Sequence, residues 1–212
     1  MNEKLEYLSK KDPILGRLID IIGQLALYKR EDHYISLVKS IIGQQLSVKA
    51  AGTIIARFMN FTGCTITPDK IIMFSDETLR EIGISYRKIK YIKDLSQKVL
   101  DKEIKLEALD KLSNEEVINT LTNVKGIGIW TAEMFLIFSL GRENVLSLLD
   151  VGLQRGAKWL YNCSDGKTTL MDKGTNWFPY TSIASLYLWE AVNRGFVNTH
   201  KSFDDFLLNH PN

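Results

Sequence analysis

VKGIGIWTA, residues 124–132, is the stretch of sequence that decides how this chain folds. Gly126 and Gly128 stand two positions apart, between the end of one predicted helix and the start of the next. Glycine lets the backbone turn sharply there and leaves the N–H groups unobstructed by side chains. Because the positive end of the following helix favours an anion, the segment predicts a phosphate site. Taken alone, the two glycines also fit a plain turn between helices.

Capping signals place helices on both sides of this turn. Ser113 and Glu116 form a capping-box pattern that opens a helix through Leu121, and an apolar helix runs from near Ile129 to Gly141. Apolar spacing and cap residues predict the remaining helices at residues 12–25, 34–42, 47–58, 75–82, 85–100, 150–161 and 179–194, with a short one after Ser202. No segment alternates as a strand does. The chain is therefore predicted to be all-α, with about ten short helices.

Composition excludes several classes of protein. The chain has 212 residues, 45% of them hydrophobic, which is enough for a substantial core. No stretch reaches the roughly 20 apolar residues of a membrane span, and the charged start is unlike a secretory signal, so we expect a cytoplasmic protein without membrane contact. Cys64 and Cys163 belong to no C-x-x-C pair, which argues against an iron–sulfur cluster and favours buried structural thiols.

Charge permits a nucleic-acid partner without requiring one, because the net charge is only +2. The predicted helix 85–100 is locally basic and carries Arg87, Lys88, Lys90, Lys93 and Lys98. This cluster is compatible with phosphate contacts, although charge alone favours a solvated helix face.

The run at residues 121–132, followed by LDVGLQRG at 149–156, resembles the helix-hairpin-helix base-excision DNA glycosylases, in particular the 3-methyladenine DNA glycosylase II branch. SIIGQQLS at 40–47, the basic helix at 83–95 and the helix at 182–190 extend the match. The resemblance implies a two-lobed all-α fold with the active-site cleft between the lobes.

The same resemblance implies lobe boundaries. Residues 36–141 are expected to form one lobe, which contains the hairpin. Residues 1–35 and 142–212 are expected to form the second lobe, which carries the catalytic aspartate. The β-rich amino-terminal domain of some members of the family is not expected, because no strand-rich region precedes the core.

Asp150 is the catalytic carboxylate that the resemblance implies. Cleavage of an N-glycosidic bond builds oxocarbenium character on the sugar, and a nearby carboxylate stabilises that charge or assists attack by water. Asp150 also begins a predicted helix, and without the resemblance an N-cap is the simpler interpretation. The two roles are compatible. The family often has a proline and a second acid just before this aspartate, where this chain has Ser147, Leu148 and Leu149.

Trp130 stands where bifunctional relatives resembling endonuclease III have a lysine that attacks the sugar. Simple hydrolysis without strand cleavage is therefore expected. The resemblance places Trp130, Met134 and Trp189 around the extruded base, where an electron-rich ring suits a cationic alkylated purine. Core packing is the alternative for both tryptophans. Met134 is aromatic in some relatives, and Tyr180-Thr181 replaces a Trp-Arg pair, which leaves the preferred lesion open.

Two further sets of residues take DNA-binding roles from the resemblance. Residues of the hairpin bind the DNA backbone: Lys125, Gly126 and Gly128. Residues of an upstream loop enter the duplex and fill the gap left by the flipped nucleotide: Gln44, Gln45 and Leu46. An exposed turn between helices is the alternative for this loop.

A monovalent cation at the hairpin is the one bound ion that the resemblance implies. Backbone carbonyls of Thr122, Val124 and Ile127 fall at the positions that hold it in relatives, where it bridges to phosphate. No cofactor is expected to be required.

The function implied is a monofunctional DNA glycosylase that removes alkylated purines, of the 3-methyladenine type, from double-stranded DNA in base excision repair. We expect a monomer. Two alternatives stay open: a glycosylase for mismatched or deaminated bases on the same scaffold, and a non-catalytic DNA-binding module that keeps the hairpin. No phosphate-binding loop or H-E-x-x-H motif competes with these interpretations.

Overall fold

A computed structural model describes residues 3–29, 32–63 and 66–210. Over these residues the secondary structure is helical and contains no β-strand, which confirms the all-α prediction. Cys64, one of the two cysteines interpreted as structural thiols, lies outside the described residues. None of the helices in the described ranges combines the length and the apolar character needed to cross a membrane.

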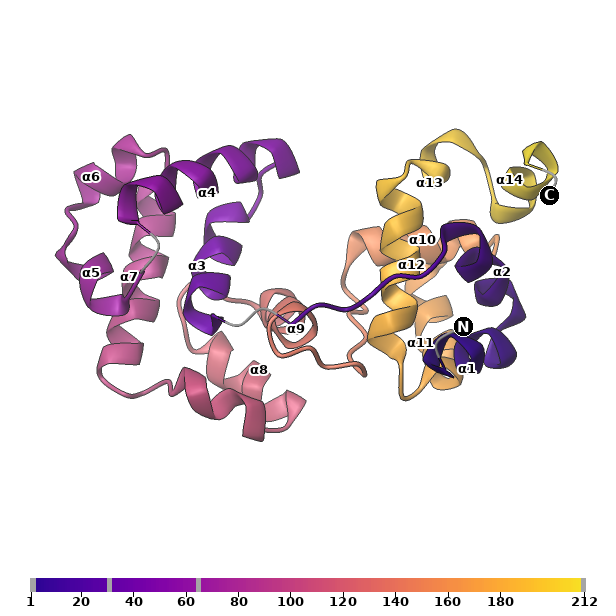
Figure 1. Ribbon diagram of the computed structural model, residues 1–212, viewed down its shortest axis with the longest axis horizontal. Helices are drawn as coiled ribbons and strands as arrows, with labels where there is room; N and C mark the ends of the chain where they lie inside the picture. The colour runs from indigo at the N-terminus through magenta and orange to yellow at the C-terminus, as the bar shows by residue number, and fades with distance from the viewer. Residues whose placement is uncertain (1–2, 30–31, 64–65, 211–212) are drawn as a thin grey trace. The chain divides into compact units, whose positions relative to one another are not determined.

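The chain divides into two compact units, each of which is described by itself. Unit 1 consists of residues 1–28 and 141–212, and unit 2 of residues 29–140 (Figure 1). The family resemblance implied divisions at 35/36 and 141/142. Unit 1 is therefore discontinuous in sequence, with unit 2 inserted between its second helix and the rest.

Unit 1 is a helical bundle around one apolar core. Its helices are α1 (Glu3–Lys11), α2 (Pro13–Ile22), α10 (Val151–Leu160), α11 (Gly166–Trp177), α12 (Thr181–Asn193), α13 (Phe196–Thr199) and α14 (Phe203–Asn209). Helix α12 packs against α2 and α10 and buries Tyr187 and Leu188 completely. A Cβ on Gly156 of α10 would lie 2.9 Å from the Leu188 carbonyl oxygen, so glycine lets these two helices approach closely. This close approach places the start of α10 beside α12.

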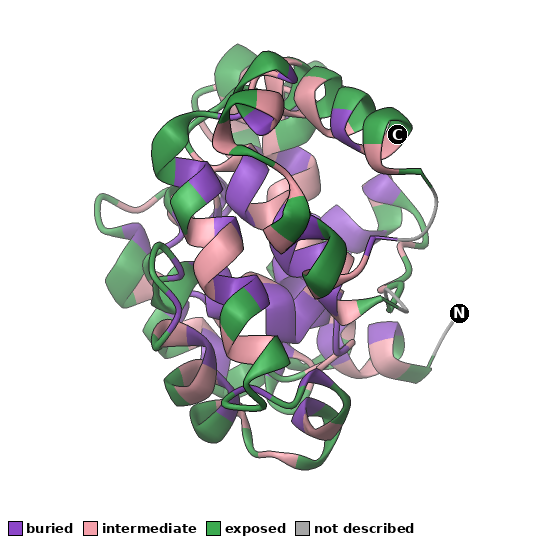
Figure 2. Cartoon of the chain, turned by 90° about the vertical axis from the view of Figure 1, so that its left-hand side faces the viewer, coloured by how far each residue is buried: buried purple, intermediate pink, exposed green. Residues whose placement is uncertain are grey.

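Unit 2 surrounds a second core and contains the hairpin. Its helices are α3 (His33–Gly43), α4 (Val48–Thr62), α5 (Pro68–Met73), α6 (Asp76–Glu81), α7 (Tyr86–Leu100), the 3-10 helix η1 (Leu106–Lys111), α8 (Asn114–Thr122) and α9 (Ile129–Phe138). Helix α7 packs against α3, α5 and α6, and buries Ile89, Ile92 and Leu95. Figure 2, which faces this part of the chain, shows helices with one buried side and one exposed side.

Most helix starts follow the predicted caps. Ser113 accepts a hydrogen bond from the Glu116 N–H, and the Glu116 carboxylate accepts one from the Ser113 N–H, so the predicted capping box is confirmed. Side-chain caps also form at Asp12, Ser47, Ser75, Ser85, Asp150 and Ser202. Helices α1, α5, α11 and α13 and the turn η1 were not predicted. Helix α11 contains two glycines and only a weak apolar stripe, which gives it little local helix signal.

Candidate active site and DNA-binding hairpin

Asp150 is the N-cap of α10 and is almost fully buried, with 8% of its surface exposed. Its Oδ1 atom accepts a 2.6 Å hydrogen bond from the Leu153 N–H. The same oxygen accepts a 2.9 Å hydrogen bond from Nε1 of Trp189, which lies on α12. Two N–H donors, one from the helix itself and one from a neighbouring helix, thus fix the orientation of the carboxylate. The N-cap role is confirmed, and it leaves the carboxylate in place for chemistry.

Gly152, in the first turn of α10, keeps this site compact. A Cβ at Gly152 would lie 3.2 Å from Oδ1 of Asp150 and 3.6 Å from Cδ1 of Trp189. Contacts of 3.2 Å are tighter than ordinary van der Waals packing, so a larger residue would press on the carboxylate. Glycine at this position leaves room for the carboxylate and the indole to meet.

The loop before Asp150 is anchored at two points. Nε2 of Gln154 donates to the Leu148 carbonyl at 2.7 Å, which folds the end of the loop onto α10. Farther back, the Ser182 hydroxyl donates to the Val145 carbonyl at 3.1 Å and accepts from the Val145 N–H at 2.9 Å. The chain therefore reaches Asp150 through a fixed loop, although the proline and second acid common in the family are missing.

The hairpin between α8 and α9 requires glycine at Gly126. Its φ of +83° lies in the left-handed region, and a Cβ there would sit 2.1 Å from Cδ2 of Tyr91. Gly128 differs, because its φ is −96° and a Cβ would meet nothing within 4 Å. Gly128 is the N-cap of α9 and makes no side-chain cap, so the helix begins without the capping side chain that would compete with an anion for its first backbone N–H groups.

Lys125 is held by an aspartate on α7. Its backbone N–H donates to Oδ2 of Asp94 at 2.9 Å, and its Nζ lies 3.5 Å from Oδ1 of the same carboxylate. The Lys125 side chain is 76% exposed, whereas that of Asp94 is 16% exposed. The lysine charge is therefore at the surface, but its N–H is already used inside the protein.

The three residues of the upstream loop have different partners. Nε2 of Gln44 donates to the Gly126 carbonyl at 2.8 Å, which ties the loop directly to the hairpin. Gln45 has a φ of +56°, and its Oε1 accepts a 2.9 Å hydrogen bond from Arg87. Leu46 is 37% exposed. The loop and the hairpin thus form one connected surface within unit 2.

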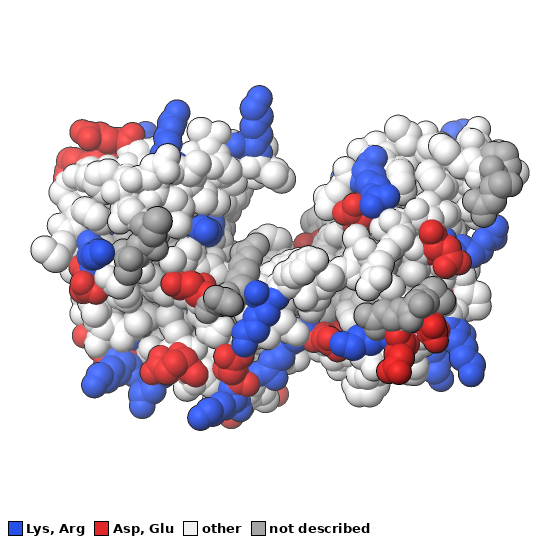
Figure 3. Space-filling view, in the orientation of Figure 1, with Lys and Arg blue, Asp and Glu red and all other residues white. Residues whose placement is uncertain are grey.

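Helix α7 braces this surface, which is not what its basic composition suggested. Besides Arg87, Lys88 donates from Nζ to the Ile42 carbonyl at 2.8 Å, and burial together with the Arg87 charge lowers the pKa of the Lys88 amine. Lys93 pairs with Asp76, and Lys98 pairs with Glu103. Four of the five basic side chains in the cluster therefore bind protein groups. Figure 3 shows basic and acidic side chains interspersed over the visible face.

The predicted base-pocket residues lie on two helices. Trp130 and Met134 are four residues apart on α9 in unit 2, and Trp189 lies beside Asp150 in unit 1. Trp130 is 42% exposed, which speaks against the core-packing alternative for this residue. Met134 and Trp189 are half-buried. Trp130 is thus partly exposed on a helix that is otherwise strongly apolar.

Sequence reasoning missed the residues beneath the hairpin, Tyr91 and Asp94. Both lie on α7, with Arg87 one turn before Tyr91, so the three share one face of the helix at spacings of four and three. This spacing in the sequence indicates that the three side chains share a helix face. It does not indicate that this face packs against the hairpin.

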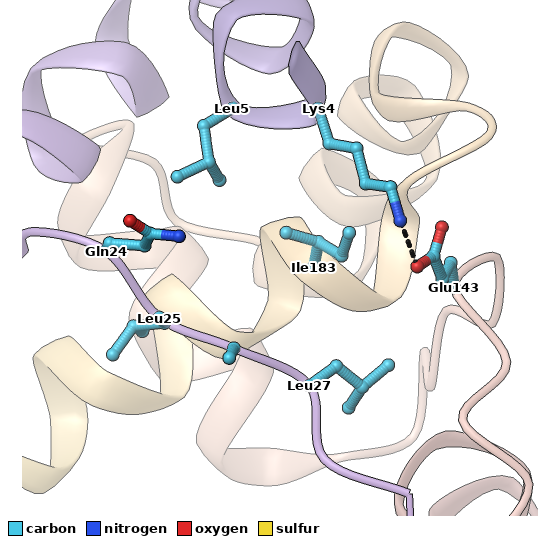
Figure 4. A pocket seen from close by; sticks show the side chains of 8 residues that line it. Lys4, Leu5, Gln24, Leu25, Leu27, Glu143 and Ile183 are labelled. Atoms are coloured by element: carbon cyan, nitrogen blue, oxygen red, sulfur yellow. Dashed lines mark hydrogen bonds and ion pairs between the residues drawn. The ribbon is translucent and has the colours of Figure 1, made fainter. Parts of the chain in front are cut away.

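A separate small pocket occurs in unit 1. It has a volume of about 170 Å³, and Figure 4 shows Lys4 and Glu143 forming an ion pair among its lining residues. None of the predicted site residues lines it.

Comparison with known proteins agrees with this geometry. Residues 38–179 match the HhH-GPD superfamily of base excision DNA repair proteins. A Bacillus halodurans DNA-3-methyladenine glycosidase structure is 42% identical, with a TM-score of 0.86, and the match covers 98% of this chain and 96% of that one. A Schizosaccharomyces pombe 3-methyladenine DNA glycosylase, solved with abasic DNA, is 31% identical, with a TM-score of 0.82 over 91% of this chain and 97% of that one.

A longer Bacillus subtilis protein is 33% identical over 168 residues, which is 75% of this chain but only 58% of that protein. The matched segment of the superfamily covers the loop at 44–46, the hairpin and Asp150. The chain belongs to the HhH-GPD superfamily of base excision DNA repair proteins. The resemblance noted in the sequence is thereby confirmed.

Proposed function

We propose that this protein is a monofunctional DNA glycosylase that hydrolyses the N-glycosidic bond of alkylated purines, of the 3-methyladenine type, in double-stranded DNA. The single observation that carries the proposal is the buried Asp150 carboxylate, held by the Leu153 N–H and the Trp189 indole at the start of α10. The relatives named above, with 42% and 31% identity, are glycosylases for 3-methyladenine. We expect the protein to act as a monomer.

Asp150 would act on the sugar. As the bond to the base breaks, positive charge develops on the sugar ring, and a fixed carboxylate stabilises it without having to reorganise. The same carboxylate can orient or deprotonate the water that attacks the anomeric carbon. The bonds to Oδ1 hold the group in one orientation, which is the condition for this kind of stabilisation.

Trp130 supports the hydrolytic, monofunctional part of the proposal. An indole has no amine to form a Schiff base with the sugar, so this position supplies no lyase nucleophile. Its 42% exposed ring can instead stack on a flipped base. A methylated purine carries positive charge, and the face of an indole attracts a cation, so an alkylated base is favoured over a neutral one.

The hairpin and the upstream loop supply DNA binding in this proposal. The first turn of α9 would hold a phosphate through backbone N–H groups, without reading sequence. Gln45 and Leu46 would enter the duplex, while Gln44 joins their loop to the hairpin. The hydrogen bonding of the Val124 carbonyl is compatible with a monovalent cation at the hairpin. The Val124 carbonyl, which accepts one 3.1 Å hydrogen bond from the Ile127 N–H, has a second lone pair for an ion that it would share with the Thr122 and Ile127 carbonyls.

Release of free base from methylated duplex DNA tests the function. The wild-type protein should release methylated purines and leave abasic sites without nicking the strand. Asp150→Asn should lower the single-turnover rate constant at least about 100-fold while DNA binding persists. Asp165→Asn is the matched control, because Asp165 is the N-cap of α11 in the same unit and the same change there neutralises a capping carboxylate without touching the site.

The alternatives are decided in the same assay. Uracil-containing and mismatched duplexes serve as further substrates, and release from these alone would favour the deaminated-base or mismatch glycosylase. Binding without base release from any duplex would make the protein a non-catalytic module and overturn the proposal. Undiminished release by Asp150→Asn would overturn the catalytic assignment.

A further inference from the structure

An acidic side chain lies directly against the hairpin that is expected to bind phosphate. Both carboxylate oxygens of Asp94 face Lys125, one at 2.9 Å from its backbone nitrogen and the other at 3.5 Å from Nζ. Asp94 reaches the hairpin from α7, 31 residues earlier in the chain. A negative charge at this position repels the DNA phosphate that the hairpin is expected to bind. The presence of Asp94 is therefore not explained by a need for tight DNA binding.

The two carboxylate oxygens of Asp94 contact different groups of Lys125 and therefore have different effects. The bond to the Lys125 N–H fixes the backbone one residue before Gly126, whose left-handed conformation shapes the turn. The ion pair to Nζ offsets the charge of a side chain that is 76% exposed. A lysine whose charge is offset by a neighbouring carboxylate neutralises a phosphate less well, and it releases fewer counterions on binding.

We propose that Asp94 is a positioning residue that sets specificity: it shapes the hairpin and at the same time weakens binding to undamaged DNA by restraining Lys125. This inference rests on the proposed function, in which the hairpin contacts the DNA backbone. Phosphate contacts supply affinity for any sequence, so limiting them makes tight binding depend on the extruded base. A repair enzyme that searches long stretches of undamaged DNA releases it faster as a result.

Asp94→Asn tests the charge separately from the shape, because the amide oxygen still accepts a hydrogen bond from the Lys125 N–H. The variant should bind an undamaged duplex more tightly than the wild type in 50 mM salt, by about 3-fold or more. If Lys125 gains one full phosphate contact, the slope of log affinity against log salt steepens by about 0.9, so the gain shrinks about 3.5-fold at 200 mM salt.

Two controls isolate the pair. Asp101→Asn makes the same change on the same helix, at the C-cap of α7, and should leave binding unchanged. In a Lys125→Gln background, Asp94→Asn should tighten binding clearly less than it does in the wild type, because only the direct repulsion between Asp94 and phosphate is then removed. Lys125→Gln alone should reduce the salt slope by clearly less than about 0.9, because Asp94 already offsets part of the lysine charge. This last measurement requires no variant at Asp94, so it stands even if Asp94→Asn folds poorly.

Weaker or unchanged binding by a folded Asp94→Asn would overturn the proposal and leave Asp94 with a structural role only. A full loss of about 0.9 in slope for Lys125→Gln alone would also overturn it. These measurements use undamaged DNA and no base release. Their failure is therefore distinguishable from failure of the proposed function, which is judged on base release and on Asp150→Asn.

Discussion

The indole of Trp189 donates a 2.9 Å hydrogen bond to Oδ1 of Asp150, joining α12 to the start of α10. The Leu153 N–H donates to the same oxygen, so the carboxylate is held from its own helix and from a neighbouring one. The bond is possible because Gly156 lets α10 and α12 approach and Gly152 leaves space at the contact. In the proposed function, Trp189 would therefore act on the chemistry through Asp150.

Trp189→Phe should lower the single-turnover rate constant for base release about 10- to 100-fold. The substitution keeps an aromatic ring but removes the donor, and a hydrogen bond to a charged group contributes about 1.5–3 kcal/mol. A difference of about 1.4 kcal/mol is a factor of ten in rate. Quenched single-turnover kinetics on methylated duplex DNA measure this effect.

Trp159→Phe is the control for this change. Trp159 is buried in the same unit, and its indole nitrogen has no hydrogen-bond partner among the described residues. Its replacement should cost stability through lost packing while leaving the excision rate unchanged. Equal rates for Trp189→Phe and the wild type would show that the bond to Asp150 does not contribute to catalysis.

Gly126→Ala should destabilise the hairpin and weaken DNA binding at least about 10-fold. A left-handed φ in a non-glycine residue costs about 1–3 kcal/mol, and the new Cβ would also overlap the Tyr91 ring. Gly128→Ala is the matched control for stability, since its φ is negative and the space is open. Thermal unfolding should separate the two variants, and equal stabilities would contradict the role given to Gly126.

Local sequence patterns predicted those parts of the fold that depend on residues three or four apart. The caps at Ser85, Ser113 and Asp150 each involve a side chain and an N–H three residues later, and all three are present. Helix α11 escaped prediction because Gly166 and Gly174 lower its local propensity. Tertiary packing requires glycine at Gly166, since a Cβ there would lie 2.2 Å from the Gln154 carbonyl oxygen.

The candidate site was predictable in its parts but not in its connections. The resemblance indicated Asp150 and Trp189 separately, and only the structure joins them across 39 residues. The bond from Gln44 to Gly126 spans 82 residues, and the one from Lys125 to Asp94 spans 31. Such long-range contacts produce no periodic pattern in the sequence, because only tertiary packing brings the partners together. For the same reason, charge alone favoured a solvated face for the basic residues of α7, although four of the five bind protein groups.

Stability should fall in acid as two helix caps lose their charge. Hydrogen bonds from Ser113 lower the pKa of Glu116 below 4.5, and bonds from Thr168 lower the pKa of Asp165 below 3.8. A depressed folded-state pKa means that the contribution is fully present above the unfolded-state value and is lost as pH falls through the folded value. Glu116→Gln should therefore flatten the decline in stability below about pH 4.5.

Denaturant unfolding between pH 3 and pH 6 measures this decline, with Glu115→Gln as the neighbouring control, since Glu115 lies in the same first turn without closing the box. A decline of the same steepness in Glu116→Gln and the wild type would show that the capping box does not contribute to acid sensitivity.

Gln44→Leu should lower single-turnover excision about 5-fold, because it removes the bond between the inserting loop and the Gly126 carbonyl, and a neutral hydrogen bond contributes about 1 kcal/mol. Affinity for undamaged duplex should change little, since the phosphate-binding turn of α9 is untouched. The loss therefore falls on the step in which the base is extruded. Gln97→Leu is the control, because it removes a side-chain hydrogen bond between Gln97 of α7 and the C-cap Asp101, which does not involve the hairpin. Full excision activity in Gln44→Leu would show that loop and hairpin act independently.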